Sequence, residues 1–170
     1  MDESAIYPLP ARVRTWARRG QTPILKATLT HDHLSVIGGI TQDGTLYTTA
    51  QRTAFTSHDI VRFLKHLLRH IEGNLVVIWD GATIHRSKVV KAFLATPAAK
   101  RLHLERLPAY APELNAIELL WKHLKRVLLP NRDFRGLGRL WDELTAVFAK
   151  VRRRPDLIRS FIAHVDGLVS

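Results

Sequence analysis

Residues 74–80 read NLVVIWD and hold the longest purely apolar run of the chain, the five residues Leu75 to Trp79. Because this run lacks alternating polar side chains, it predicts a strand buried on both faces in the middle of a sheet. The run is followed by Asp80. Polar residues just past the carboxyl end of a buried strand are where α/β sheets build sites, although an aspartate that caps the turn at Gly81 has the same pattern.

Upstream of this strand, three β-branched runs at 24–30, 34–40 and 44–52 predict an antiparallel meander. Asp43-Gly44, between the second and third runs, is a hairpin signal. A helix follows, with Ser57 as its expected N-cap and Gly73 as its end. Its apolar residues recur at helical spacing: Ile60, Phe63, Leu64, Leu67, Leu68 and Ile71.

Downstream, the pattern predicts a helix over 87–94, a strand over 102–107, a proline-bounded turn and a helix over 113–128. Two more amphipathic helices follow, and the chain shows no internal repeat. The order of strands and helices indicates a mixed α/β sheet with helices packed on it. The apolar stripe of the 113–128 helix repeats in a 3-4-3-4 pattern: Leu114, Ile117, Trp121, Leu124 and Leu128.

The composition limits the class of protein. A chain of 170 residues, 46% apolar and without cysteine, is long enough to bury one core, and it excludes disulfide-rich and cysteine-zinc proteins. A five-residue apolar run is far below the roughly 18 that a membrane span needs. The acidic start, with Asp2 and Glu3, is unlike a signal peptide. We therefore expect a cytoplasmic protein with no membrane partner.

The net charge points to a polyanionic partner. The chain carries 26 Lys and Arg against 15 Asp and Glu, a formal charge of +11, and the excess is densest in the last third. Such a field favours nucleic acid, with ribosome-like association or an anionic membrane surface as the other options. Against this background three acidic residues stand out, although each also has an ordinary explanation. Asp80 fits a turn cap, Glu118 a surface pair with Lys122, and Asp2 a solvated terminus.

Three blocks of sequence nevertheless occur together in one order. They are DESAIYPLP (2–10) followed by WARRGQTP, then VVIWDGATIH (76–85), then LPAYAPELNAIELLWKHLK (107–125). They resemble the three catalytic blocks of DDE transposases of the mariner superfamily, particularly its bacterial insertion-sequence branch. The resemblance covers residues 2 to about 128, and its third block is the most specific. The matching residues of that block are Tyr110, Pro112, Leu114, Asn115, Ile117, Glu118 and Trp121.

The resemblance implies that Asp2, Asp80 and Glu118 are the catalytic residues and bind two Mg²⁺ or Mn²⁺ ions. Carboxylate oxygens suit such hard cations. His85 and Asn115 occupy site-supporting positions of the same blocks. The implied function is metal-dependent DNA cleavage at element ends, followed by strand transfer into target DNA. Three departures affect the positioning of the carboxylates: Gly81, Ala111 and Ala116 stand where Asn, Ser and Pro are usual.

The implied fold is a ribonuclease H-like mixed sheet of about five strands with helices on both faces, its first strand truncated before Asp2. Residues 1–130 would form the endonuclease/integrase-like catalytic domain, and residues 131–170 a helical extension of the same domain. A truncated first strand is expected to hold Asp2 loosely. In the family a helix-turn-helix segment precedes this domain, so a separately encoded upstream segment is expected as a partner. The resemblance also implies a homodimer and a bacterial, nucleoid-associated location.

Basic side chains near the second and third carboxylates are expected to contact DNA phosphates on double-stranded DNA. Trp16, set among arginines, is a candidate for base stacking. The rival interpretation is a catalytically inactive, basic DNA-binding remnant of a split or decayed insertion element. The DNA upstream of the coding sequence distinguishes the two. The predicted DNA-binding residues are Arg86, Lys88, Lys91, Lys122, Lys125, Arg126, Trp16, Arg18 and Arg19.

Overall fold

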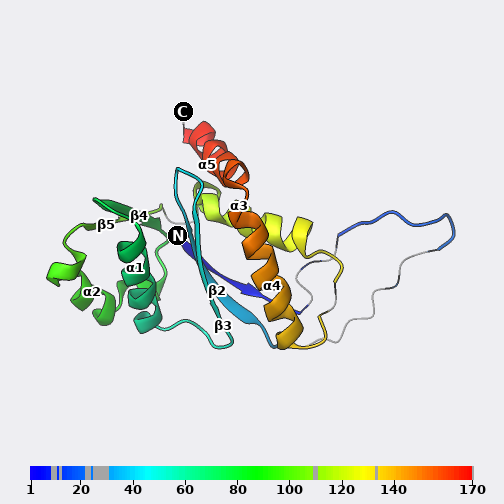
Figure 1. Cartoon of the computed structure of the whole chain (residues 1–170), viewed down its shortest axis with the longest axis horizontal. Helices are drawn as coiled ribbons and strands as arrows, with labels where there is room; N and C mark the ends of the chain where they lie inside the picture. Colours follow the sequence, from blue (N-terminus) through cyan, green and yellow to red (C-terminus); the bar gives the residue numbers. More distant parts are fainter. Residues whose placement is uncertain are drawn as a thin grey trace.

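The computed structural model contains a three-stranded antiparallel sheet in the order β1-β2-β3 (Figure 1). Its strands are β1 (Asp2–Ile6), β2 (Leu34–Ile40) and β3 (Leu46–Gln51). The predicted strand at 24–30 lies outside the described residues except for Ile24, and the third strand of the sheet is Asp2–Ile6 instead. The structure describes residues 1–8, 11, 13–21, 24, 31–108, 111–132 and 134–169.

The hairpin predicted at Asp43-Gly44 is confirmed, because β2 and β3 pair along their length across it. Gly44 has a φ of +90°, which L side chains rarely adopt. The amide and hydroxyl of Thr45 both donate to the Asp43 carboxylate, and the Thr41 hydroxyl donates to it as well. These bonds close the turn locally and set the register of the two strands.

The predicted central strand forms as β4 (Leu75–Trp79) and pairs in parallel with β5 (Leu102–Arg106). Within the described residues these two strands form a sheet of their own, so the single five-stranded sheet is not observed. One hydrogen bond, from the Met1 nitrogen to the Ile78 carbonyl at 2.7 Å, connects the start of β1 with β4.

Burial of β4 on both faces was a wrong prediction. Leu75, Val77 and Trp79 are buried, whereas Val76 and Ile78 are 56% and 52% exposed. One face packs on helices, but the other borders a cavity of about 590 Å³ that is shared with the C-terminal helix. The continuous apolar run 75–79 therefore forms a strand in which helices bury one face and leave the other partly exposed.

Helix α1 (Ser57–His70) confirms the predicted helix, but its N-cap is Thr56 rather than Ser57. Asp59 explains the difference. Its carboxylate accepts from the Thr56 amide at 2.8 Å while the Thr56 hydroxyl accepts from the Asp59 amide, a reciprocal capping box. Helix α2 (Lys88–Leu94) begins after Ser87, whose hydroxyl accepts from the Val90 amide.

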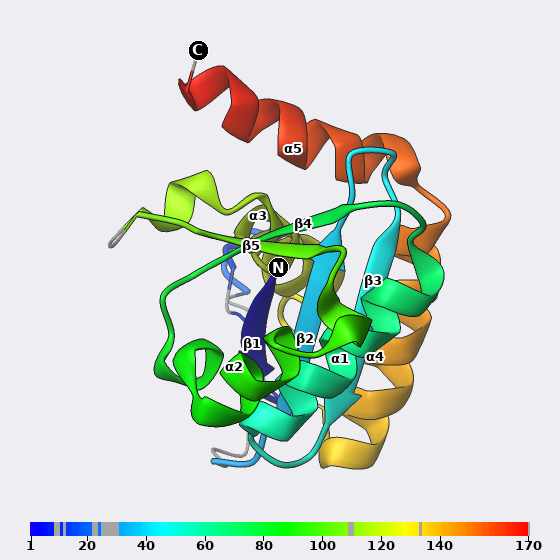
Figure 2. The same ribbon diagram turned by 90° about the vertical axis from the view of Figure 1, so that its left-hand side faces the viewer.

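The helix predicted over 113–128 has three parts. A 3₁₀ turn, η3 (Pro112–Leu114), precedes α3 (Ala116–His123), and a π-helical turn, η4 (Leu124–Leu128), follows it. The predicted stripe is nevertheless the buried face, with Ile117, Trp121 and Leu124 at most 2% exposed. The chain then forms α4 (Leu137–Arg152) and α5 (Pro155–Val169). Figure 2 shows α5 crossing above β4 and β5.

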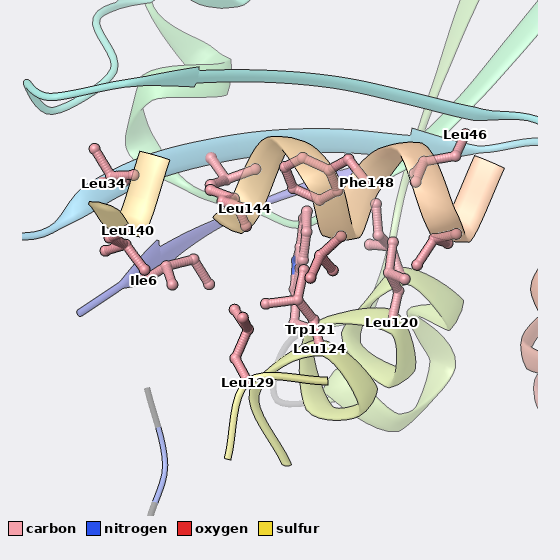
Figure 3. Close-up of a cluster of buried hydrophobic side chains, with 14 of the residues drawn as sticks. Ile6, Leu34, Leu46, Leu120, Trp121, Leu124, Leu129, Leu140, Leu144 and Phe148 are labelled. Carbon is pink, nitrogen blue, oxygen red and sulfur yellow. The ribbon is translucent and has the colours of Figure 1, made fainter. Parts of the chain in front are cut away.

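Helices cover both faces of the β1-β2-β3 sheet. Val36 packs with α3 and α4 in one buried cluster, and its neighbour Ile37 packs with α1, α2 and β4 in another. This alternation follows from the opposite orientation of successive side chains in a strand. Figure 3 shows the first cluster, in which Trp121 lies between α4 and the turns around Leu129. The mixed α/β class is thus confirmed. Trp141 is 38% exposed on α4.

Candidate active site

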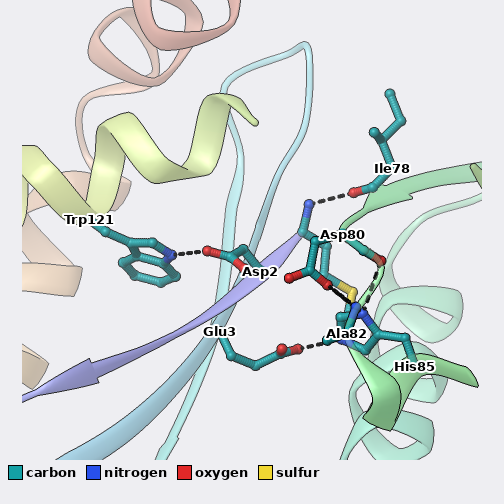
Figure 4. Close-up of polar contacts among 8 residues, drawn as sticks. Asp2, Glu3, Ile78, Asp80, Ala82, His85 and Trp121 are labelled. Carbon is teal, nitrogen blue, oxygen red and sulfur yellow. Dashed lines mark hydrogen bonds and ion pairs between the residues drawn. The ribbon is translucent and has the colours of Figure 1, made fainter. Parts of the chain in front are cut away.

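Asp2 is the first residue of β1 and lies opposite Gly38 of β2. The strand pairs over all five of its residues, and Asp2 is only 6% exposed, so it is not loosely held. The indole nitrogen of Trp121 donates to Oδ2 of Asp2 at 3.0 Å (Figure 4). Burial, and then the negative charge of Glu118, raise the pKa of Asp2 to about 7, while the indole hydrogen bond opposes the rise.

Glu118 lies in the first turn of α3 and is exposed. Its amide donates to the carbonyl of buried Asn115, the N-cap residue of the helix, at 2.9 Å. Lys125 follows Glu118 by two turns, and its Nζ donates to the Ser4 hydroxyl at 2.9 Å. Burial lowers the pKa of Lys125, opposed by the charges of Glu118 and Asp2. This predicted DNA contact is therefore directed into the acidic region.

Asp80 follows β4 and is held by His85. Nδ1 of His85 lies 2.9 Å from Oδ1 of Asp80, and its Nε2 lies 3.0 Å from the Glu3 carboxylate. The ring stacks on Trp79 with centroids 4.3 Å apart, and the Ala82 amide donates to Asp80 at 3.0 Å. Burial pulls the pKa of His85 down, but the Glu3 hydrogen bond and charge, aided by Asp80, raise it above its usual value.

The start of β1 and the end of β4 lie side by side, as Figure 4 shows. Burial lowers the pKa of the Met1 amino group to about 6, and the negative charges of Asp2, Glu3 and Asp80 oppose this shift. The acidic side chains of β1 and Asp80, which follows β4, therefore share one region. Among the described residues, however, no three His, Asp or Glu side chains are grouped so as to hold one metal ion.

Glu3 and Arg106 also contribute to this region, and neither was predicted from the sequence as a site residue. The guanidinium of Arg106 occupies the space where a Cβ at Gly81 would lie, so Gly81 allows an arginine to pack beside Asp80. Trp79 and Arg106 are register partners in the parallel pair β4-β5. The place of Arg106 could have been inferred from the sequence, because the carboxyl ends of neighbouring parallel strands meet at one sheet edge.

The predicted DNA-binding residues are divided among separate surfaces. Residues 86–91 lie around α2, at the left of Figure 1, and residues 16–19 lie in the extended segment at its right. Asn131 anchors the base of that segment through two hydrogen bonds to the Val13 backbone, at 2.9 and 3.0 Å. Trp16 is fully exposed. The other exposed members of the set are Arg18, Arg19, Arg86, Lys88, Lys91, Lys122 and Arg126.

A sequence model described as DDE superfamily endonuclease matches residues 1–140, most of the chain. The chain belongs to the DDE endonuclease superfamily. No curated protein matches it closely enough to add a relative. Within the described part of this DDE domain, no helix is both long and apolar enough to cross a membrane.

Solved structures of the Mos1 transposase share the fold of this DDE domain. The Mos1 mariner paired-end complex with Mg is 18% identical, with a TM-score of 0.69, and the one with Mn is 16% identical, with a TM-score of 0.67. The Mos1 strand transfer complex is 17% identical, with a TM-score of 0.66. These matches cover 95–98% of this chain but only 52–54% of the Mos1 chains, so the DDE domain spans about half their length.

Proposed function

We propose that this DDE domain is the catalytic part of a mariner-type transposase that cleaves DNA at element ends and transfers the strands to target DNA. The observation that carries the proposal is that α3, the helix of Glu118, reaches Asp2, because Trp121 of the same helix donates to the Asp2 carboxylate at 3.0 Å. Asp2 and Glu118 are far apart in the sequence, yet the negative charge of Glu118 contributes to the raised pKa of Asp2 in a chain with a net charge of +11. Asp80 follows the neighbouring strand, which supplies a third carboxylate to the region.

The donor chemistry of these residues fits hard divalent cations. Asp2, Asp80 and Glu118 offer only carboxylate oxygens, which Mg²⁺ and Mn²⁺ prefer. We infer that these three residues hold two such ions. When bound, the ions would activate a water and stabilise charge on the attacking and leaving phosphate oxygens.

The chain's own residues would prepare this chemistry. His85 fixes the Asp80 carboxylate and links it to Glu3. Asn115 begins the helix that carries Glu118. The exposed cations Arg86, Lys88 and Lys122 would bind phosphates without reading sequence. A plot of log affinity for DNA against log salt concentration should therefore have a negative slope. Removing one phosphate contact should make that slope shallower by about 0.9.

We further propose that residues 1–130 form the catalytic unit and residues 131–170 its helical extension. The full transposase would add a helix-turn-helix segment, function as a homodimer and belong to a bacterial insertion sequence. It would act in the cytoplasm at the nucleoid. The sequence blocks support the family resemblance from which these proposals follow, and the coverage of about half the Mos1 chain supports the additional segment.

A catalytically inactive DNA-binding remnant is the second candidate function. It is favoured by one observation, that no three potential ligands among the described residues are grouped around one metal position. In this candidate the basic surface still binds DNA, but His85 and Glu3 retain Asp80 in a purely structural contact.

A cleavage assay distinguishes the two candidates. DNA carrying the element's terminal inverted repeats is incubated with the protein and Mg²⁺ or Mn²⁺, and nicking is compared for wild type, Asp80→Ala and the exposed control Asp142→Ala. The transposase proposal expects nicking by wild type and by the control only. Equal nicking by wild type and Asp80→Ala contradicts it, and DNA binding without nicking by any protein supports the remnant.

A further inference from the structure

Trp121 connects the core to the acidic region. Its ring belongs to the buried cluster between the sheet and α4, and its side chain is 2% exposed. At the other edge of the ring, the indole nitrogen donates to Asp2 at 3.0 Å. Tryptophan is a donor only, so this contact holds a carboxylate oxygen without competing as a metal ligand. A carboxylate with about four lone-pair sites keeps capacity for an ion.

Gly38 makes this arrangement possible. It is the register partner of Asp2, and a Cβ at this position would lie 2.8 Å from Cη2 of Trp121 and 2.9 Å from Cδ1 of Ile117. Real Cβ atoms essentially never show contacts below 3.0 Å, so a larger residue would displace the ring. At neighbouring Gly39 the nearest atom to such a Cβ is 3.9 Å away. A side chain would therefore clash with Trp121 and Ile117 at Gly38, whereas Gly39 has room for one.

We propose that Trp121 is a positioning residue that holds Asp2 in place as a metal ligand, and that Gly38 is required to seat its ring. This inference rests on the proposed metal-dependent function. Hydrogen bonds from outside a metal site orient its ligands, and their loss typically weakens metal binding about 10–100-fold.

A purely structural role for Trp121 makes a different prediction. The ring then contributes buried apolar area, and the N–H group is of no consequence for metal binding. Trp121→Phe keeps an aromatic ring in the cluster but removes the N–H donor, so it separates the two roles. Gly38→Ala keeps the donor but crowds the ring, and it provides a second test should Trp121→Phe not fold.

The experiment uses the full 170-residue chain. Affinity for Mn²⁺ is measured by electron paramagnetic resonance of the free ion for Trp121→Phe and Gly38→Ala. Their matched controls are Trp141→Phe, on the half-exposed ring, and Gly39→Ala. In parallel, the Trp121 indole N–H signal is followed by NMR. We expect Mn²⁺ affinity to fall about 10–100-fold in the two test variants and to stay within about twofold in the controls.

The NMR signal reports on the hydrogen bond itself. It should shift on Asp2→Ala and in Gly38→Ala, but not in Gly39→Ala. If folded Trp121→Phe and Gly38→Ala bind Mn²⁺ as tightly as wild type, the positioning role is wrong while the proposed function survives. If wild type binds no Mn²⁺, the proposed function fails and the positioning role with it. An indole signal unchanged by Asp2→Ala would overturn the hydrogen bond independently.

Discussion

Replacing Asp2 by asparagine should stabilise the metal-free fold. Burial and the charge of Glu118 raise the pKa of Asp2 from 3.8 to about 7. Since one pKa unit corresponds to about 1.4 kcal/mol, the ionised carboxylate costs on the order of 4 kcal/mol at pH 8. Asparagine keeps an oxygen that can accept from Trp121. We therefore expect Asp2→Asn to raise the free energy of unfolding by about 2–4 kcal/mol at pH 8.

The sign of the pH dependence makes this prediction specific. Because the pKa of Asp2 is higher in the folded state, the folded protein takes up a proton between pH 7 and pH 3.8. The cost is absent below the lower value and complete above the higher one. The gain from Asp2→Asn should thus be full at pH 8 and close to zero near pH 4.

Urea unfolding in EDTA, followed by circular dichroism, measures both the gain in the free energy of unfolding from Asp2→Asn and its dependence on pH. Exposed Asp142→Asn serves as the control and should change the free energy of unfolding by less than about 0.5 kcal/mol. An Asp2→Asn protein that is no more stable than wild type at pH 8 would refute the reasoning. A gain of the same size at pH 4 and pH 8 would do so as well.

Three further predictions concern the fold. Gly44→Ala should lower the free energy of unfolding by more than about 2 kcal/mol, because its φ is +90° and a Cβ would lie 2.6 Å from the Pro155 carbonyl oxygen. Gly73→Ala, with φ +71° and no atom within 4 Å of such a Cβ, should lower it by only about 1–2 kcal/mol. Thermal unfolding compares them, and equal losses would contradict the close approach at Gly44. Thr56→Ala should lower the free energy of urea unfolding by about 1–2 kcal/mol, because it removes the hydroxyl that accepts from the Asp59 amide in the capping box. The Thr56 backbone and side-chain hydrogen bonds hold the pKa of Asp59 below its usual value, so Asp59→Asn should destabilise at neutral pH and progressively less as the pH falls through the acidic range. A loss that does not depend on pH would contradict this.

The elements that could be predicted were those whose signals are local. The apolar run 75–79, the helical spacing of α1 and the Asp-Gly turn each specify one element from a few neighbouring residues. The strand at Asp2–Ile6 has no such signal, because DESAI is short and largely polar and forms a strand only through pairing with β2. For the same reason the exposed face of β4 could not be predicted, since it depends on which helices reach it.

The same distinction between local and long-range signals applies to the candidate site. Asp2 and Glu118 were predicted only because their surrounding blocks resemble a family, whereas Asp80 also had a local signal, its place directly after an apolar strand. The contacts that hold them join residues distant in sequence, such as Trp121 with Asp2 and His85 with Glu3. Composition and periodicity contain no information on such pairs. From the sequence, Trp121 was therefore predicted as a core residue and Lys125 as a DNA contact. Only the fold shows that both side chains reach β1.

The central claim is that Asp2, Asp80 and Glu118 share a metal site, and affinity cleavage tests it most directly. Fe²⁺ is bound in place of Mg²⁺, and ascorbate with peroxide generates radicals that cut the polypeptide beside the ion. Mass spectrometry then locates the cuts. We predict cuts near residues 2, 80 and 118 together, suppressed by excess Mg²⁺. Cuts confined to other positions, or cuts near 2 and 118 with none near 80, would contradict the claim.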